Sequence, residues 1–243
     1  MRLDALLVEK GLAPSRSKAT TLIKNGHVVV PGQEKLKPSL EVAEEAAVRV
    51  TTTDMGYVSR GADKLLSLLP ATGFRFKQKV VLDIGASTGG FTQLALEDGA
   101  KHVYAVDVGA GQLAAPLLND PKVSNLEKTD GRQLTPQNIP QPPEVLLCDV
   151  SFISCTKILP DVLATFPSIG DVFVLVKPQF ELTRQDVGPG GIVRNKTRQM
   201  AALESVKACL QEAGLETPTF VRTALARPGA NQEFMLHGRK PAA

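Results

Sequence analysis

The chain has 243 residues, of which 43% are hydrophobic and 22% are charged, and its formal net charge is +3. This length suits one full catalytic domain with a small additional module, and the composition is that of a globular protein. The sequence has no apolar run of bilayer length and no apolar core of a secretory signal at its start. Its three cysteines lack the spacing of a disulfide framework or a zinc site, so a reducing cytoplasm is the expected compartment.

The N-terminal part predicts a compact helix–helix–strand module. Apolar residues recur at helical spacing in 2–10 and 15–25, and short β-like runs follow at 27–30 and 47–50. Residues 1–40 contain seven lysines and arginines but only three acidic residues. This local excess of positive charge suggests a polyanionic partner, although exposed lysines are common on any surface.

Beyond a polar connector, strand-like and helix-like segments alternate. The predicted strands are 79–84, 102–107, 122–126, 144–149 and 171–177, and the predicted helices are 89–98, 111–118, 155–166 and 196–213. Such alternation predicts an α/β domain with a parallel sheet and helices on both faces. Two later β-like runs, 217–225 and 232–238, have no helix between them and predict an antiparallel hairpin at the sheet edge.

A glycine-rich loop follows the first strand of this sheet, where open α/β sheets bind ligands. The dinucleotide pattern G-x-G-x-x-G lacks its second glycine here because Ser87 stands in its place, and Asp83 suits a cationic amino-acid ligand better than a pyrophosphate. Asp107 ends the next strand and can accept both hydroxyls of an adenosine ribose. The loop therefore favours S-adenosylmethionine over NAD, the alternative being an ordinary strand-to-helix turn. The candidate donor-binding residues of these segments are Asp83, Gly85, Ser87, Thr88, Gly89, Phe91 and Asp107.

Two opposite charges end neighbouring strands of the predicted sheet. Asp149 follows one strand and Lys177 follows the next, so both are expected to project into the crevice of the glycine loop. A charge at the end of a buried strand is costly unless it is paired, and these two residues would satisfy each other. A structural ion pair is the simpler reading, but a pair at the ligand face is more often functional.

Together these motifs resemble the TlyA family of rRNA 2′-O-methyltransferases, whose catalytic domain is FtsJ-like and whose members are often labelled haemolysins. Residues 2–32 are similar to an S4-type RNA-binding domain, and 57–62, 149–154, 175–181 and 187–191 are similar to family signatures. The resemblance implies a Rossmann-like class I methyltransferase with a mostly parallel seven-stranded sheet, preceded by a small α+β S4 domain. The expected boundaries are 1–55 for the S4 domain, 56–59 for the linker and 60–243 for the methyltransferase domain.

The resemblance also implies a Lys-Asp-Lys-Glu tetrad, which falls on Lys64, Asp149, Lys177 and Glu233. Without the resemblance, the sequence predicts that Lys64 and Glu233 are surface residues. Lys177 is the expected general base, although the two carboxylates favour its charged form and leave orientation as an alternative role. Asp130 stands where many members have asparagine, and we expect it to contact the adenine. No metal is expected, because the leaving group departs as a neutral thioether.

The implied reaction is methyl transfer to a ribose 2′-hydroxyl of a cytidine in rRNA. The chain looks like the short form of the family, which is associated with 23S rRNA, and 16S rRNA stays open as a further substrate. Whether the substrate is naked rRNA or an assembled subunit also stays open. The expected RNA contacts are Arg2, Arg16, Lys18, Lys24 and Arg60, each of which could instead be a solvated surface charge.

Three alternative functions are weighed against this one. An RNA-binding protein with an inactive methyltransferase fold is disfavoured by the intact Asp83, Asp107, Asp149 and Lys177. A membrane-lytic haemolysin is disfavoured by the lack of a spanning segment. An NAD-dependent enzyme is disfavoured by the missing second glycine.

Overall fold

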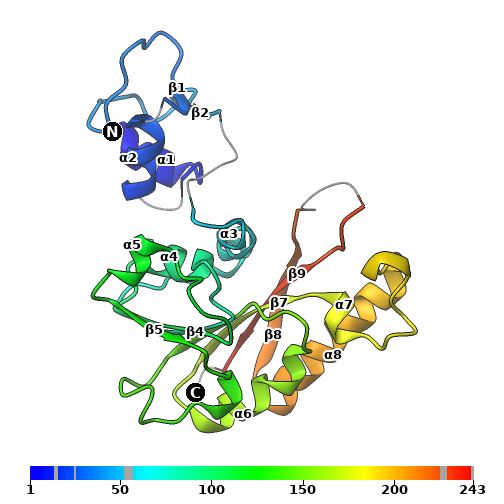
Figure 1. Cartoon of the computed structure of the whole chain (residues 1–243). Helices are drawn as coiled ribbons and strands as arrows, with labels where there is room; N and C mark the ends of the chain where they lie inside the picture. The colour runs from blue at the N-terminus through cyan, green and yellow to red at the C-terminus, as the bar shows by residue number, and fades with distance from the viewer. Residues whose placement is uncertain (14–15, 25, 52–56, 225–228, 242–243) are drawn as a thin grey trace. The chain divides into compact units, whose positions relative to one another are not determined.

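The computed structural model shows a chain that divides into two compact units, Met1–Tyr57 and Val58–Ala243 (Figure 1). The expected linker begins at residue 56, which lies outside the described residues, as do positions 15 and 25 at the ends of the second predicted helix. The structure describes residues 1–13, 16–24, 26–51, 57–224 and 229–241.

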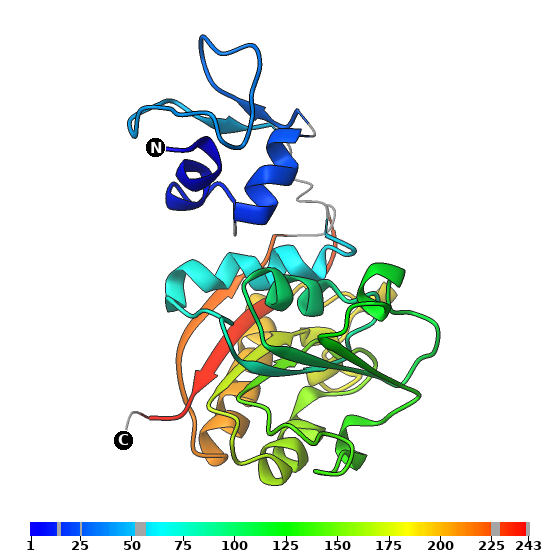
Figure 2. The same cartoon turned by 90° about the vertical axis from the view of Figure 1, so that its left-hand side faces the viewer.

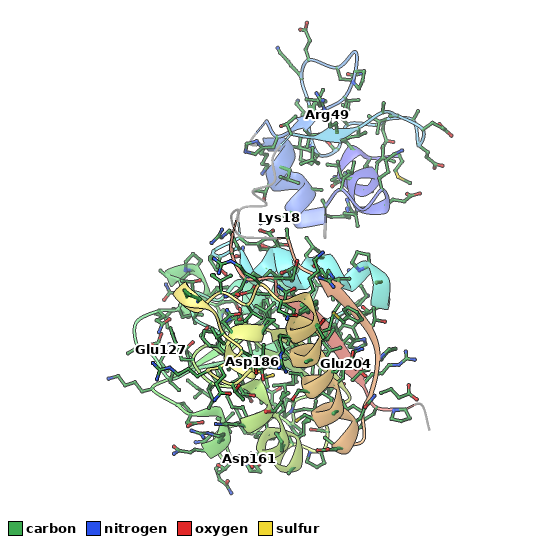
Figure 3. All side chains as sticks on the ribbon, turned by 90° about the vertical axis from the view of Figure 1, so that its right-hand side faces the viewer. Lys18, Arg49, Glu127, Asp161, Asp186 and Glu204 are labelled. Atoms are coloured by element: carbon green, nitrogen blue, oxygen red, sulfur yellow. The ribbon has the colours of Figure 1, made fainter. Side chains whose placement is uncertain are left out.

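The N-terminal unit has two helices and a two-stranded antiparallel sheet. The elements are α1 (Leu3–Glu9), α2 (Arg16–Lys24), β1 (Val28–Val29) and β2 (Arg49–Val50). Arg49 of β2 is labelled in Figure 3 and is exposed. The apolar residues that predict the two helices form the core of the unit, since Leu3, Leu7, Leu22 and Ile23 are buried together. The helix–helix–strand prediction is therefore confirmed.

A seven-stranded sheet forms the centre of the second unit (Figures 1 and 2). Its spatial order is β5-β4-β3-β6-β7-β9-β8, with parallel pairing from β5 to β7 and antiparallel pairing of β9 with both of its neighbours. This mostly parallel sheet confirms the predicted fold class. The strands are β3 (Val80–Ile84), β4 (His102–Asp107), β5 (Val123–Glu127), β6 (Val145–Cys148), β7 (Asp171–Val176), β8 (Glu216–Arg222) and β9 (Phe234–Arg239).

Helices cover both faces of this sheet (Figure 2). On one face lie α3 and α4, and on the other lie α6 and α8, which enclose the larger apolar core with alternate residues of β3, β6 and β7. The α-helices are α3 (Gly61–Thr72), α4 (Gly90–Glu97), α5 (Ala115–Leu118), α6 (Leu159–Thr165), α7 (Pro178–Glu181) and α8 (Lys196–Glu212), and the 3-10 turns are η1 (Gly131–Gln133), η2 (Cys155–Lys157) and η3 (Pro189–Gly191). No helix among the described residues is long and apolar enough to cross a membrane.

The helices of the second unit differ from the predicted elements in four places. The helix expected over 111–118 is helical only in α5, because the carboxylate of Glu127 accepts the backbone N–H groups of residues 111 to 113 and holds them in a loop. The helix expected over 155–166 breaks into η2 and α6 next to Pro160, which has no N–H to continue the first turn. Helices α3 and α7 were not predicted, and α3 contains Pro70 in its last turn.

The C-terminal hairpin is also arranged differently from the simplest expectation. Strands β8 and β9 pair antiparallel, as predicted, with Phe220 opposite Leu236. The later strand β9 is nevertheless the inner one, and Val174 of β7 pairs with Leu236. All of β9 except its last residue is buried, whereas β8 alternates between exposed and half-buried residues at the edge. This insertion carries the start of β9 toward the carboxyl end of the parallel strands.

Candidate active site

A cavity of about 500 Å³ opens at the carboxyl ends of β3, β4 and β6. This is the edge at which open α/β sheets bind ligands. Its lining comes from the four connections that follow β3, β4, β5 and β6. The residues that bear on binding are Gly85, Ser87, Asp107, Asp130, Asp149 and Phe152.

The glycine loop approaches the end of β6 very closely. Gly85 has a φ of 81°, and a Cβ at this position would lie 2.4 Å from the backbone oxygen of Asp149. Ser87 also has positive φ, 48°, and its N–H donates to Oδ2 of Asp107 over 2.8 Å. The other oxygen of Asp107 accepts the N–H of Gly109 over 2.7 Å. Each oxygen of Asp107 therefore has one bond that fixes it and a further lone pair toward the cavity.

Glu127 is a residue of this site that the sequence patterns miss. It ends β5 at the same edge of the sheet (labelled in Figure 3), and hydrogen bonds from the backbone of residues 111 to 113 lower the pKa of its carboxyl group. The loop it holds places Gln112, whose Oε1 accepts a hydrogen bond from Oγ of Ser87 over 3.1 Å. The sequence does not reveal that Glu127 holds this loop, because an acidic residue at the end of a strand belongs to no recognisable motif.

Asp83 lies behind the glycine loop and is fully buried. Its Oδ2 accepts a hydrogen bond from Oγ1 of Thr92 over 2.6 Å, whereas its Oδ1 is buried without a hydrogen-bond partner. Burial, together with a smaller contribution from the negative charge of Asp149, raises the pKa of this carboxyl to about 7. The residues that line the two cavities do not include Asp83.

The other donor-pocket candidates lie on the same loop. Thr88 lines a second cavity, and Gly89 has a φ of 95°, where a Cβ would lie 2.2 Å from Leu117. Phe91 is almost fully buried at the start of α4 and also borders that cavity. Asp130 borders the first cavity, but its carboxylate is held by Arg132, with Nη2 2.6 Å from Oδ2.

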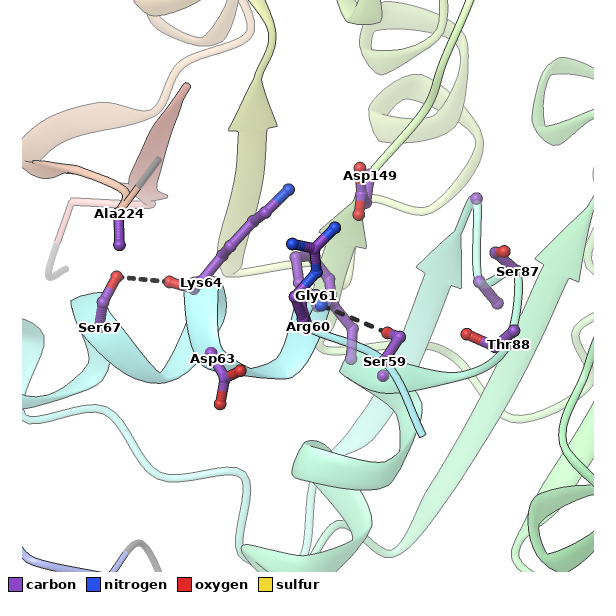
Figure 4. A pocket seen from close by; sticks show the side chains of 14 residues that line it. Ser59, Arg60, Gly61, Asp63, Lys64, Ser67, Ser87, Thr88, Asp149 and Ala224 are labelled. Atoms are coloured by element: carbon purple, nitrogen blue, oxygen red, sulfur yellow. Dashed lines mark hydrogen bonds between the residues drawn. The ribbon is translucent and has the colours of Figure 1, made fainter. Parts of the chain in front are cut away.

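The second cavity, of about 440 Å³, lies on the other side of the glycine loop (Figure 4). Ser87 and Asp149 border both cavities. Arg60 and Lys64, at the start of α3, extend toward the side of the cavity where Asp149 lies. The chain therefore has two adjoining spaces, one beside the strand-end acids and one beside basic side chains.

The four residues of the expected tetrad form two ion pairs. Nζ of Lys177 lies 2.5 Å from Oδ1 of Asp149, and it donates a hydrogen bond to Oγ of Ser151 over 2.8 Å. Nζ of Lys64 lies 2.6 Å from Oε2 of Glu233. Lys64 and Asp149 border the same cavity. The residues that the sequence alone assigns to the surface are thus held in the neighbourhood of the strand-end pair.

Phe152 is a second feature that the sequence patterns do not single out. Its side chain is 92% exposed, and its φ of 66° is a left-handed conformation that costs energy for an aromatic residue. It borders the first cavity, and its ring lies 5.3 Å from that of Phe180 at a tilt of 48°. An exposed aromatic face at the mouth of a cavity is a platform for a flat, unsaturated ligand.

The basic residues predicted to contact RNA differ in their surroundings. Arg2 and Arg16 both bond to the buried Asp4, at 2.9 and 3.1 Å, and remain about half exposed. Nζ of Lys18 lies 4.2 Å from the ring centroid of Tyr57. Lys24 is exposed in the last turn of α2. Arg60 belongs to the second unit and borders the second cavity.

Two family models match the chain and together cover most of it. The FtsJ-like methyltransferase model matches residues 57–240, and the S4 domain model matches residues 1–48. A relative from Mycobacterium tuberculosis, named 16S/23S rRNA (cytidine-2′-O)-methyltransferase TlyA, is 41% identical over 97% of this chain and 88% of the relative. The chain belongs to the TlyA family of FtsJ-like, S-adenosylmethionine-dependent methyltransferases.

Other relatives of this TlyA-family chain carry haemolysin names. Hemolysin A of Brachyspira hyodysenteriae is 34% identical over 98% of this chain and 99% of the relative. A solved structure from Streptococcus thermophilus with a hemolysin name is 34% identical, with a TM-score of 0.74, and the match covers 100% of this chain and 89% of that one. A magnesium protoporphyrin IX methyltransferase from Synechocystis, at 14% identity and TM-score 0.52 over 75% of this chain and 83% of that one, shows the fold alone.

The residues of the TlyA-family site fit S-adenosylmethionine. The bend at Gly85 leaves no space for a side chain, so only backbone faces the ligand there. Asp107 would hold a ribose with its remaining lone pairs. The Oδ1 atom of Asp83 lies behind the loop without a hydrogen-bond partner, and a carboxylate oxygen in this position favours a cationic ligand. The size and polarity of the cavity suit an adenosine.

Proposed function

We propose that this chain transfers a methyl group from S-adenosylmethionine to the 2′-hydroxyl of a cytidine in ribosomal RNA. The observation that carries the proposal is the presence of two ion pairs, Lys177–Asp149 and Lys64–Glu233, near a cavity that fits the methyl donor. The name of the M. tuberculosis relative supports cytidine and both 16S and 23S rRNA. A Campylobacter jejuni relative, 35% identical over 86% of this chain and 88% of the relative, is named for 23S rRNA alone. We therefore propose 23S rRNA as the first substrate and 16S rRNA as the second.

When bound, S-adenosylmethionine supplies a methyl group on a sulfonium that departs as a neutral thioether. The chain then has to hold a ribose hydroxyl in line with that methyl and to manage one proton. Lys177 is the proposed proton acceptor. Asp149 and Ser151 both hold its Nζ, which fixes the direction of the amine. A rate that rises with pH is the signature of a base, and a flat profile is that of a group that only orients the substrate.

The proposed RNA contacts come from both units. Arg2, Arg16, Lys18 and Lys24 belong to the N-terminal unit and match the S4 model, and Arg60 borders the site. Phe152 adds an exposed ring on which a base extruded from the RNA can stack. The contacts of these lysines and arginines with RNA phosphates should weaken as the salt concentration rises. A salt-independent affinity for rRNA fragments would contradict this footprint.

The deciding experiment maps 2′-O-methylation on both rRNAs, supplied naked and as assembled subunits, with and without the purified chain and the donor. The expected result is one new 2′-O-methylcytidine in 23S rRNA, and a second in 16S rRNA for a dual substrate range. A chain that binds the donor but adds no methyl group to any of these RNAs is an inactive fold. Leakage of liposome contents caused by the chain alone would instead favour a membrane-lytic activity.

A further inference from the structure

The loop between β6 and η2 has no regular structure of its own. It spans residues 149–154 and contains Asp149, Ser151 and Phe152, which all border the first cavity. Phe152 adopts a left-handed φ of 66°, and its side chain is almost fully exposed. A strained, exposed loop keeps one conformation only when contacts elsewhere impose it. The fixed positions of Asp149 and Ser151 therefore need an anchor.

Helix α7 contacts this loop at both of its ends. At the N-terminal end, Lys177 lies 2.5 Å from Asp149 and donates to Ser151. At the C-terminal end, Glu181 accepts the N–H of Cys155 over 3.0 Å and the hydroxyl of Ser154 on its other oxygen. Between these contacts the ring of Phe180 packs against Phe152. The loop is thus held on both sides by one short helix.

The Glu181 contact also fixes where the loop ends. Ser154 caps η2, since its Oγ accepts the N–H of Thr156 over 3.2 Å. A carboxylate that receives a backbone N–H and a hydroxyl at the same turn forms charge-assisted hydrogen bonds, which are stronger and more directional than neutral ones. Glu181 lies 4 residues after Lys177 and borders neither of the cavities beside the glycine loop. It acts through other residues and not on the substrate.

We propose that Glu181 is a positioning residue: its bonds to Ser154 and Cys155, the Glu181 clamp, hold the 149–154 loop so that Asp149 and Ser151 meet Lys177 and Phe152 stays at the cavity mouth. This inference rests on the proposed function for its catalytic consequence. Loss of the clamp frees the loop and displaces the partners of Lys177, which slows methyl transfer. The glycine loop and Asp107 keep their own hydrogen bonds, none of which involves Glu181.

The first test reports on the loop without any reaction. The chain contains no tryptophan, so Phe152→Trp introduces a single fluorescent reporter at the loop tip. In this background, Glu181→Ala is expected to raise the acrylamide quenching constant and to lower the fluorescence anisotropy at residue 152. Glu181→Gln restores both, since its amide can accept from Cys155 and donate to Ser154.

Glu144→Ala is the matched control. Glu144 also bonds to one backbone N–H and one side chain, those of Val80 and Lys79, but it precedes β6 at the opposite end of the strand. Its removal leaves the reporter unchanged. Equal quenching in Glu181→Ala and its parent overturns the clamp. If Glu181→Ala does not fold, Ser154→Ala removes half of the clamp and is read in the same way.

The second test measures single-turnover methyl transfer in the chain with Phe152 intact. At saturating donor and RNA, Glu181→Ala is expected to lower the rate about 10- to 100-fold, as displacement of a catalytic group by about 1 Å does. Glu181→Gln recovers most of the rate. A purely structural role would instead lower the melting temperature and leave the rate at 25 °C unchanged, which overturns the proposal. If the unmodified chain itself methylates no RNA, the proposed function fails while the quenching test still decides the clamp.

Discussion

The ammonium of Lys177 lies 2.5 Å from Oδ1 of Asp149, and the two residues directly follow β7 and β6, which are neighbouring parallel strands. Parallel strands end at the same edge, so this pairing follows from the topology as soon as the two strands are adjacent. Both side chains are largely buried, with 11% and 22% of their surfaces exposed. Removal of one partner therefore leaves the other without its compensating charge.

The first prediction concerns this pair. Lys177→Ala removes the proposed proton acceptor and is expected to lower the single-turnover methyl-transfer rate by at least about 100-fold, the range of general acid–base catalysis. Donor affinity changes little, because Lys177 does not border the donor cavity. Rapid-quench assays and calorimetric titration of the donor measure the two effects. Lys101→Ala, which removes an exposed charge before β4, is the control, and full activity in Lys177→Ala would refute the assignment.

The second prediction concerns the pH dependence of stability. Burial raises the pKa of Asp83 to about 7, above the ordinary value of 3.8. The folded chain therefore binds this proton more tightly than the unfolded chain, and the contribution of Asp83 to stability is greatest at low pH and is lost as pH rises through about 7. Asp83→Asn removes the ionisable group. We expect it to raise the free energy of unfolding by about 1–3 kcal/mol at pH 8 and by less at pH 5.

Urea denaturation at the two pH values measures this difference. Donor affinity at pH 8 is expected to fall about tenfold, or ~1.4 kcal/mol, in the same variant, because the buried negative charge behind the loop is gone. Asp98→Asn is the contrasting control: Asp98 is paired with Arg75 at 2.6 Å, so its replacement lowers stability. A pH-independent effect of Asp83→Asn would contradict the raised pKa.

The third prediction separates two reasons for glycine at position 85. Gly85→Ala places a Cβ 2.4 Å from the backbone oxygen of Asp149 in a residue with positive φ, and we expect a loss of about 2–4 kcal/mol of stability together with loss of donor binding. Gly73→Ala has a φ of 64° but no atom within 4 Å of its Cβ, so it should cost only about 1 kcal/mol. Thermal melts compare the two. Equal effects would mean that the clash is relieved by movement of the loop.

The fourth prediction concerns the exposed ring of Phe152. Phe152→Ala is expected to weaken RNA binding by about 1–3 kcal/mol, the contribution of one stacked base, with almost no change in stability because the side chain is 92% exposed. Fluorescence titration of a target-containing RNA fragment measures the affinity. Leu118→Ala removes another exposed apolar side chain, which is 53% exposed, and should leave RNA affinity unchanged. An equally small effect of both variants would remove Phe152 from the RNA surface.

The fifth prediction concerns the acid that holds two arginines in the N-terminal unit. Asp4 accepts hydrogen bonds from Arg2 and Arg16, and the bond from Arg2 is the main cause of the lowered pKa of its carboxyl group. A lowered native pKa stabilises the fold above the ordinary pKa, and this stability is lost as pH falls through the native value. Asp4→Asn should therefore destabilise the unit by about 1–3 kcal/mol at pH 7 but by less at pH 3.

The measurement for Asp4 is unfolding followed at both pH values, with RNA affinity as a second readout. RNA affinity should fall because the two guanidinium groups lose the partner that orients them. Glu9→Gln, which removes an exposed acid at the end of α1, is the control. If Asp4→Asn strengthened RNA binding, the arginines would be sequestered by Asp4 instead of positioned by it.

The sequence predicts the central sheet well, because β3, β4, β6 and β7 are continuous apolar runs that end in a charge or a glycine loop. It predicts the meeting of Asp149 and Lys177 for the same reason. It predicts a helix over 111–118 that is too long, because the carboxylate of Glu127 replaces the first turn with a loop through contacts that span 14 to 16 residues. The local spacing of apolar residues does not show that a distant carboxylate accepts these backbone N–H groups.

The pairing of Lys64 with Glu233 is beyond local reasoning for a different reason. The two residues are 169 positions apart, and they meet only because β9 is inserted between β7 and β8. A hairpin can dock on a sheet through either of its strands, and the apolar pattern of 217–225 and 232–238 does not choose between them. Only the burial of β9, in all but its last residue, makes the choice, and burial is a property of the assembled sheet.

The place of β9 in the sheet also has a consequence for biosynthesis. A ribosome has to translate residues 65 to 232 between the two members of the Lys64–Glu233 pair, and the inner strand of the hairpin emerges after the outer one. Contacts between such distant residues form late in folding. A nascent chain can complete the parallel core from β3 to β7 and still lack the last acid of the tetrad. We therefore expect methyl-transfer activity to appear only after Glu233 has been synthesised and β9 has entered the sheet.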